Sequence, residues 1–351
     1  VSILSFGGTI ASKVDYRTGG VSASYDASDF VEMCPELTTI ANIESRAVDC
    51  MMSEDMHPDD WLRLAHAICE EANKDHITGI VVTHGTDTLH FSTAAMSFLL
   101  EDLNKPVIFT ASQRSIDRGS TDAFMNLICA VRAAATWDGA EVVTCMHATT
   151  SDDYCFLLRG TKVRKMHTSR RDAFRPINEQ PLAKVTDQTL EVLHPNYRKR
   201  TTSTVHCSGQ FETNIALITI YPGIDPGLVE YVINKGVKGI VLAATALGHV
   251  PTSGKHSLVD VLEKAKEKGI PVVIASQTLY GRTNPYVYTN LRKLSIGLGC
   301  IFASDMTPET AYVKLGCILP KATSKEDVKT LLLENMAGEI NEIIDERSFL
   351  N

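Results

Sequence analysis

The most informative stretch of this 351-residue chain is Gly79-Ile-Val-Val-Thr-His-Gly-Thr-Asp-Thr88. Residues 80–83 are apolar or β-branched and predict a buried strand of a parallel sheet, and residues 89–100 have helical character. In open α/β sheets the chemistry lies beyond the carboxyl ends of the strands, where the next helix offers free N–H groups and a partial positive charge. Thr86 and Asp87 lie at that point. A hydroxyl beside a carboxylate suits nucleophile activation, although either residue could equally cap the helix.

A second strand end carries a glycine-rich turn. Residues 2–6 predict a short buried strand, and Gly7-Gly-Thr9 follows it. Glycines let the backbone turn tightly, which presents Thr9 at the same edge of the sheet as Thr86. The turn could instead cradle a dinucleotide phosphate, but it lacks the G-x-G-x-x-G spacing, and residues 13–24 are polar rather than helical. Two threonines, one beside a carboxylate, form a better nucleophile arrangement than either would alone.

A third polar strand end is predicted further along the chain. Residues 48–56 read as a strand with a polar exit, and a helix begins at 57–59. Ser53, Glu54 and Asp55 would therefore lie at the same functional edge of the sheet. The alternative is that these acids are solvated loop residues.

A dense basic segment occupies residues 159–174. Its cations cannot all be buried, and we expect most of them to be solvated: Lys162, Arg164, Lys165, Arg170 and Arg171. A lysine drawn beside Asp87 and partly desolvated could act as the base for a threonine hydroxyl.

The remaining pattern indicates two α/β domains. Strands are predicted at 106–110 and 141–146, with a helix from Asp122, for which Asp122 is the simplest N-cap. Residues 182–210 are mostly polar and read as a linker with some edge-strand character. Beyond it, short apolar runs alternate with helical stretches and predict a smaller parallel unit; they lie at 214–220, 239–244, 271–275 and 299–303. Residues 324–327 resemble a capping box with Asp in place of Glu or Gln.

Composition narrows the class of protein. With 44% hydrophobic and 22% charged residues, and no apolar run near the ~20 residues of a membrane helix, we expect a soluble cytoplasmic protein without a signal peptide. The nine cysteines are scattered and suggest small core residues in a reducing compartment. His84 and His90 lack H-E-x-x-H spacing, so no metal site is expected. A net charge of −8 argues that a partner would hold most of any nucleic acid.

Several motifs resemble a known family. Gly7-Gly-Thr-Ile-Ala11 together with His84-Gly-Thr-Asp-Thr88 is similar to the paired signature of bacterial-type L-asparaginases and glutaminase-asparaginases. More narrowly, residues 159–174, Gln113-Arg-Ser-Ile-Asp-Arg118 and Ser304-Asp-Met-Thr-Pro-Glu-Thr310 resemble the D subunits of archaeal glutamyl-tRNA(Gln) amidotransferases. The resemblance spans nearly the whole chain. It implies an asparaginase-like α/β fold, with a larger N-terminal parallel-sheet catalytic domain at 1–210 and a smaller flavodoxin-like domain at 211–351.

The same resemblance implies the site residues. The family's catalytic threonines, aspartate and lysine fall on Thr9, Thr86, Asp87 and Lys165. Lys165 is preferred over Lys162 because its spacing to Ala173-Phe174 fits the family. Substrate contacts are expected from Ser53, Glu54, Gly8 and Ser112, with the Glu54 carboxylate suited to an α-ammonium group, and Tyr16 is a possible loop activator. Backbone N–H groups at Gly8 and Thr86 are candidates for the oxyanion hole. Which threonine attacks first stays open.

For function, the resemblance implies hydrolysis of glutamine to glutamate and ammonia. The ammonia would pass to a GatE-type kinase/amidase partner subunit that uses ATP and Mg to amidate Glu-tRNA(Gln), within a heterotetramer that contains a homodimer of this chain. No cofactor is expected on this chain itself. The D subunits usually carry a small β-domain ahead of the asparaginase-like part; we expect it to be missing here, either because it was removed or because this is a shorter lineage. The alternatives are a stand-alone L-asparaginase or glutaminase, and a non-catalytic scaffold subunit that docks through its Arg-rich loop.

Overall fold

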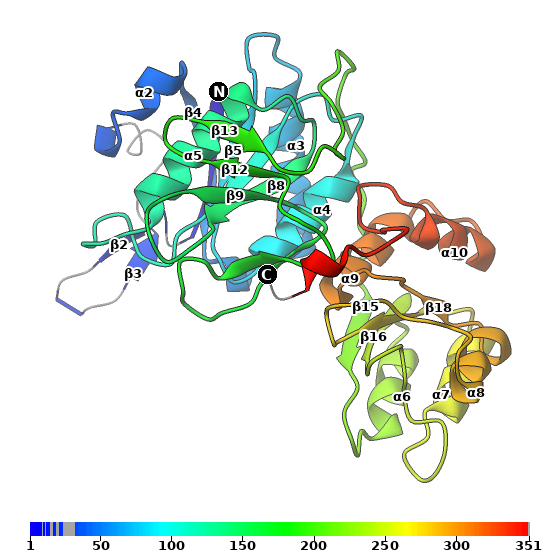
Figure 1. The fold of residues 1–351 in the computed structure, drawn as a ribbon. Helices are drawn as coiled ribbons and strands as arrows, with labels where there is room; N and C mark the ends of the chain where they lie inside the picture. The colour runs from blue at the N-terminus through cyan, green and yellow to red at the C-terminus, as the bar shows by residue number, and fades with distance from the viewer. Residues whose placement is uncertain (9, 11, 15–16, 19–20, 24–31, 350–351) are drawn as a thin grey trace. The chain divides into compact units, whose positions relative to one another are not determined.

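The chain forms two compact units, Val1–Gly209 and Gln210–Asn351. The computed structural model describes residues 1–8, 10, 12–14, 17–18, 21–23 and 32–349 (Figure 1). Each unit has its own sheet, helices and core. None of the helices in these described ranges is long and apolar enough to span a bilayer.

The first unit is built on an eight-stranded mixed sheet. Five neighbouring strands are parallel and three antiparallel strands extend one edge. In order across the sheet they are β13 (Leu190–Val192), β12 (Ala183–Val185), β9 (Cys155–Arg159), β8 (Val142–His147), β7 (Val107–Thr110), β5 (Ile80–Thr83), β1 (Ser2–Gly7) and β4 (Glu44–Met51). The predicted strand at 80–83 is therefore central, and every one of its residues is buried. The stretch at 182–210, predicted to be a linker with some edge-strand character, supplies the antiparallel edge strands β12 and β13.

Helices cover both faces of this sheet (Figure 1). They are α2 (Leu37–Ile40), α3 (Pro58–Ala72), α4 (Leu89–Leu99) and α5 (Ala123–Thr136), and short elements are η2 (Ser53–Asp55), β2 (Ser12–Val14), β3 (Val21–Ala23), β6 (Leu100–Glu101) and β14 (His206–Cys207). Helices α2 and α5 share one core with alternate strand residues such as Ile3, Val81 and Ile108. Because side chains alternate along a strand, Leu4 and Val82 point to the other face, where α3 and α4 pack.

The basic segment forms a hairpin whose two strands flank a connection that is exposed at residues 166–170. Strands β10 (Val163–Lys165) and β11 (Phe174–Pro176) pair antiparallel, with Lys165 opposite Phe174. The expectation that most of its cations are solvated is wrong: Arg170 is exposed, but Lys162 is completely buried and the other three are partly buried. Two of the partly buried cations pair with acids: Lys165 with Asp87 at 2.6 Å and Arg171 with Asp152 at 2.9 Å.

The second unit is a smaller parallel α/β layer. Its sheet runs β15 (Ile215–Thr219), β16 (Gly239–Ala244), β17 (Val272–Ser276) and β18 (Ile301–Phe302). Its helices are α6 (Pro226–Asn234), α7 (Val259–Glu267), α8 (Thr289–Arg292), η3 (Lys293–Gly297), α9 (Pro308–Ile318), α10 (Lys325–Leu333) and η4 (Glu346–Ser348). Helices α6 and α7 share one core with alternate residues of β16 and β17, while α9 and α10 share a second core with the residues between.

Candidate active site

The carboxyl ends of three strands meet in the first unit. Gly8, just after β1, has a φ of +81°, and a Cβ there would overlap the backbone of Gly85. Gly85 in turn leaves room for Ser53, whose Oγ a Cβ at Gly85 would approach to 2.6 Å. Thr88 Oγ1 donates to the Ser53 carbonyl at 2.7 Å. The glycines are therefore required because the turns after β1, β4 and β5 pass in direct backbone contact.

A hydroxyl, a carboxylate and an amine lie together at this edge. Lys165 Nζ donates to Thr86 Oγ1 at 2.9 Å and to Asp87 Oδ1 at 2.6 Å. Thr86 Oγ1 lies 3.4 Å from the same Asp87 oxygen. The Lys165 side chain is 11% exposed and that of Asp87 is 59% exposed, while Thr86 is buried. The cluster is thus shielded at the amine and open at the carboxylate.

Two different parts of the fold supply this cluster. Thr86 and Asp87 come from the turn between β5 and α4, ahead of the positive end of the α4 dipole. Lys165 is the last residue of β10, and its neighbour Met166 bonds through its N–H to the Ala173 carbonyl at 2.7 Å. The hairpin pairing therefore explains the spacing between Lys165 and the Ala173-Phe174 pair. Such a cluster can hold a proton between a hydroxyl and an amine.

The neighbouring His84 does not belong to this proton-handling cluster. Burial lowers the pKa of His84 to about 4, opposed by the hydrogen bond between its Nδ1 and the Gly85 carbonyl. Its ring stacks on Phe6, with centroids 6.2 Å apart, and lies 5.9 Å from the ring of Phe109. His84 is therefore a neutral core residue at the base of the turn.

The described residues among those expected to bind substrate lie around the same edge of the sheet, and they differ in exposure and in hydrogen bonding. Ser53 is buried in η2, and Glu54 beside it is exposed. Ser112 is also buried, but its hydroxyl donates to the Arg114 carbonyl at 2.6 Å, so that proton is already engaged within the loop after β7. Gly8 approaches Gly85 as described above. Thr9 and Tyr16 lie outside the described residues.

A further set of polar residues was missed by sequence reasoning. Asp122 occupies the N-cap position of α5, but its carboxylate makes no cap bond. It accepts instead from the backbone N–H groups of Gln113, at 2.9 Å, and Arg114, at 3.1 Å. Asn126, one turn later on the same face, donates to the Ala111 carbonyl at 2.9 Å. The i, i+4 spacing of Asp122 and Asn126 was the available signal, and the two shape the loop that carries Ser112.

In the ranges that the structure describes, no group of three or more His, Cys, Asp or Glu side chains is placed to hold a metal ion. The nine cysteines are all free thiols.

Comparison with known proteins identifies one family in both units of the chain. Residues 1–198 match the family model described as asparaginase, N-terminal, and residues 214–332 match the glutaminase/asparaginase C-terminal domain. The D subunit of the glutamyl-tRNA(Gln) amidotransferase from Thermococcus kodakarensis is 48% identical over 97% of this chain and 76% of its own length. The protein of that name from Methanothermobacter thermautotrophicus is 47% identical over 97% and 77%.

Solved structures agree with this. The thermostable L-asparaginase from Thermococcus kodakarensis superimposes with a TM-score of 0.86 at 29% identity, covering 97% of this chain and 99% of its own. L-asparaginase I from Vibrio cholerae gives a TM-score of 0.82 at 28% identity, covering 97% and 98%. The chain therefore belongs to the glutaminase/asparaginase family and, within it, to the group of glutamyl-tRNA(Gln) amidotransferase D subunits.

Proposed function

We propose that this chain is the glutaminase subunit of a tRNA-dependent amidotransferase. It hydrolyses the side-chain amide of glutamine to glutamate and ammonia, and the ammonia serves the conversion of Glu-tRNA(Gln) to Gln-tRNA(Gln). Two observations support this: the near-half identity to proteins of that name, and the contact of Lys165 Nζ with both Thr86 Oγ1 and Asp87 Oδ1. The contacts of Lys165 are the observation that supports the chemistry, because amide hydrolysis by a hydroxyl nucleophile needs a nearby group that can handle its proton.

In the mechanism we propose, a threonine hydroxyl attacks the amide carbon, with Thr9 as the first nucleophile. The C–N bond breaks, the nitrogen takes a proton and leaves as ammonia, and an ester remains on the threonine. Water then attacks the ester and releases glutamate. Thr86, Asp87 and Lys165 form the proton relay: Lys165 Nζ exchanges a proton with the Thr86 hydroxyl, and Asp87 holds Nζ in place and balances its charge. The expectation that the Gly8 N–H helps to stabilise the oxyanion is not met, because that N–H already donates to the Met51 carbonyl at 3.1 Å. The backbone N–H of Thr86 is our candidate for stabilising the oxyanion.

The rest of the reaction belongs, in this proposal, to a GatE-type partner subunit. That partner uses ATP and Mg to activate Glu-tRNA(Gln), in a cytoplasmic heterotetramer built on a homodimer of this chain. The net charge of −8 supports the view that the partner carries most of the tRNA contact, because RNA binding is dominated by neutralisation of phosphates.

Removing either end of the relay tests the proposal. Thr86→Ala and Lys165→Met should each abolish ammonia release from glutamine while the circular dichroism spectrum and melting temperature remain close to those of the wild type. Lys199→Met is the matched control, because Lys199 also pairs with an aspartate, Asp138, at 2.7 Å but on the exposed surface. Ammonia release at the wild-type rate in either relay variant would refute the assignment.

A stand-alone L-asparaginase is the second candidate, favoured by the structural likeness to enzymes of that name. It would use the same catalytic residues, so the site does not separate the two. The discriminating measurement is ammonia release from glutamine and from asparagine, each with and without the partner subunit and Glu-tRNA(Gln). The amidotransferase proposal expects glutamine turnover that rises when partner and charged tRNA are added. Partner-independent asparagine turnover as the dominant activity would favour the second candidate.

A further inference from the structure

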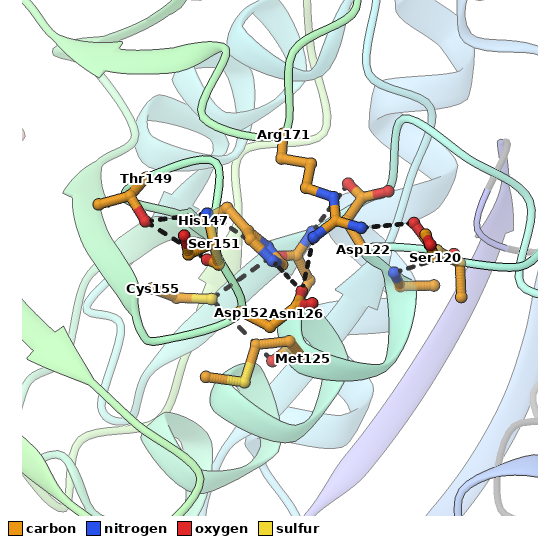
Figure 2. Close-up of polar contacts among 12 residues, drawn as sticks. Ser120, Asp122, Met125, Asn126, His147, Thr149, Ser151, Asp152, Cys155 and Arg171 are labelled. Carbon is orange, nitrogen blue, oxygen red and sulfur yellow. Dashed lines mark hydrogen bonds and ion pairs between the residues drawn. The ribbon is translucent and has the colours of Figure 1, made fainter.

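A chain of polar contacts connects the loop after β7 with the β10–β11 hairpin. It starts at the Asp122 carboxylate, which accepts from the backbone of that loop, and passes through Asn126 to His147 at the end of β8. From His147 it continues to Asp152 and then to Arg171 in the turn of the hairpin. Figure 2 shows these side chains, with His147 between Asn126 and Asp152. His147 has no exposed side-chain surface.

The orientation of the Asn126 amide is fixed by groups that cannot change roles. Its Nδ2 lies 2.9 Å from the Ala111 carbonyl, which only accepts. Its Oδ1 lies 3.0 Å from the backbone N–H of His147, which only donates. Oδ1 is therefore the atom that faces His147 Nδ1 at 2.6 Å. Since an amide oxygen only accepts, Nδ1 must carry a proton.

The other ring nitrogen of His147 faces a carboxylate. Nε2 lies 2.9 Å from Asp152 Oδ1, and the same oxygen accepts from Arg171 Nη1 at 2.9 Å. Burial alone would raise the pKa of Asp152, but the His147 hydrogen bond and the Arg171 charge outweigh it and lower that pKa. An ionised carboxylate only accepts, so Nε2 must donate as well. Both ring nitrogens are protonated in this arrangement.

The other polar groups around the ring are consistent with a cationic His147. Cys155, opposite His147 in the β8–β9 register, directs its thiol to Asn126 Oδ1 at 3.4 Å, and burial raises its pKa, so it stays a neutral donor. Asp122 supplies a second negative charge behind Asn126, whose Nδ2 lies 3.4 Å away. The cations on the hairpin side are Arg171 and Arg175, and the latter donates to the Ala148 carbonyl at 3.1 Å.

Arg171 connects this series of polar contacts to the hairpin that carries Lys165. It lies in the turn of the hairpin whose first strand ends at Lys165, and its Nη2 also donates to the Ser120 carbonyl at 2.5 Å. One end of the polar chain therefore fixes the loop of Ser112, and the other fixes the hairpin of Lys165.

We propose that His147, protonated on both ring nitrogens, is a positioning residue that holds the Lys165 hairpin in register with the loop after β7. Loss of the contact to either Asn126 or Asp152 loosens the hairpin, so glutamine hydrolysis falls. The kinetic part of this inference rests on the proposed glutaminase function, and the protonation part does not.

The proton state can be measured without any enzyme assay. In ¹⁵N-labelled protein, long-range ¹H–¹⁵N spectra report whether each imidazole nitrogen carries a proton, and His147→Gln assigns the signals. We expect both nitrogens of His147 to show the protonated signature at neutral pH. A signal typical of an unprotonated nitrogen at either position would overturn the inference, whether or not the protein is a glutaminase.

The kinetic test measures kcat and KM for ammonia release. His147→Gln should lower kcat by roughly 10- to 100-fold, the scale of a misplaced catalytic group, with little change in KM. Asp152→Asn provides a second variant that is expected to fold, because its side chain is 58% exposed, and it should lower kcat in the same direction. Asp138→Asn, an exposed acid paired with Lys199, should leave kcat and KM unchanged.

The outcomes separate the two proposals. An unchanged kcat in both His147→Gln and Asp152→Asn, or an effect confined to KM, would refute the positioning role. Complete absence of ammonia release in the wild type would refute the proposed function, and the NMR result would still decide the proton state.

Discussion

At the scale of single residues, backbone space is the strictest requirement of this site. Gly8 and Gly223 have nearly the same φ, +81° and +85°, but a Cβ at Gly8 would overlap Gly85, whereas a Cβ at Gly223 would have no neighbour within 4 Å. The two positions therefore share the cost of a left-handed conformation and differ in the steric contact.

Comparing alanine substitutions at Gly8 and Gly223 measures how much the free energy of unfolding depends on the contact between the turns after β1 and β5. Gly223→Ala should lower the free energy of unfolding by about 1 kcal/mol, the usual penalty for a side chain at positive φ. Gly8→Ala should cost several times more and remove ammonia release, because the turns after β1 and β5 must move apart. Urea unfolding and an ammonia assay on both variants provide the comparison; equal stability losses would show that the contact is unimportant.

Because His84 is buried, the stability of the folded protein should depend on pH in a known direction. Its pKa is about 4 in the folded state against an ordinary value of 6.5, so between these values the unfolded chain binds a proton that the folded chain does not. Stability should therefore fall as the pH drops from about 6.5 to about 4, by roughly 3 kcal/mol in total from this group. In His84→Gln that part of the slope should disappear in urea titrations across the range. The exposed-site control His206→Gln should keep the wild-type slope.

At the scale of elements, the N-terminus of a helix performs two different tasks in this protein. Asp225 caps α6 in the usual way and accepts from the N–H of Gly227 at 2.9 Å. Asp122 stands at the same position of α5 but turns its completely buried carboxylate away from the helix, to the N–H groups of Gln113 and Arg114. The first stabilises its own helix, and the second stabilises a loop at the active edge of the sheet.

Alanine at each position should reveal the difference. Asp225→Ala should cost about 1 kcal/mol, as for an ordinary cap. Asp122→Ala leaves backbone donors of a partly buried loop without their charged acceptor and should cost about 3 kcal/mol. It should also raise KM for glutamine, because the Ser112 loop loses its support. Chemical denaturation measures the first effect and steady-state kinetics the second; similar costs in the two variants, with KM unchanged, would contradict this assignment.

At the scale of the whole molecule, each unit depends on its own core. In the second unit Lys314 of α9 forms a fully buried ion pair: its Nζ contacts Glu339 Oε1 at 2.5 Å and donates to the Leu332 carbonyl at 2.8 Å. Glu339 also accepts from the N–H groups of Met336 and Ala337. Burial lowers the pKa of Lys314, and the charge of Glu339 opposes that shift.

Removing the cation should destabilise the second unit selectively. Lys314→Met leaves the Glu339 charge buried and should cost about 3–5 kcal/mol, whereas the double variant Lys314→Met/Glu339→Gln should recover part of that loss. Hydrogen exchange gives the location: amides of β16 and β17 should lose protection while those of β5 and β7 retain it. Equal loss of protection in both sheets would show that the units do not unfold separately.

Local pattern was sufficient for the parts of this protein that neighbouring residues determine. The apolar run at 80–83, the His57–Pro58 start of α3 and the alternation of strands and helices after residue 214 are properties of short stretches, and the structure has them as predicted. The convergence of Gly8, Ser53 and Thr86 also followed, because parallel strands bring their carboxyl ends to one edge. The family resemblance, rather than any local pattern, selected Lys165.

Tertiary structure alone decided the features that depend on distant partners. Hydropathy made residues 159–174 look solvated, yet Lys162 is buried and Lys165 reaches Asp87, because the hairpin pairs β10 with β11 and carries the lysine to a turn far away in sequence. Asp122 looked like a cap because the sequence does not show that the loop after β7 returns to it. The proton on each nitrogen of His147 is set by Asn126 and Asp152, contacts that exist only once β8, α5 and the hairpin have come together.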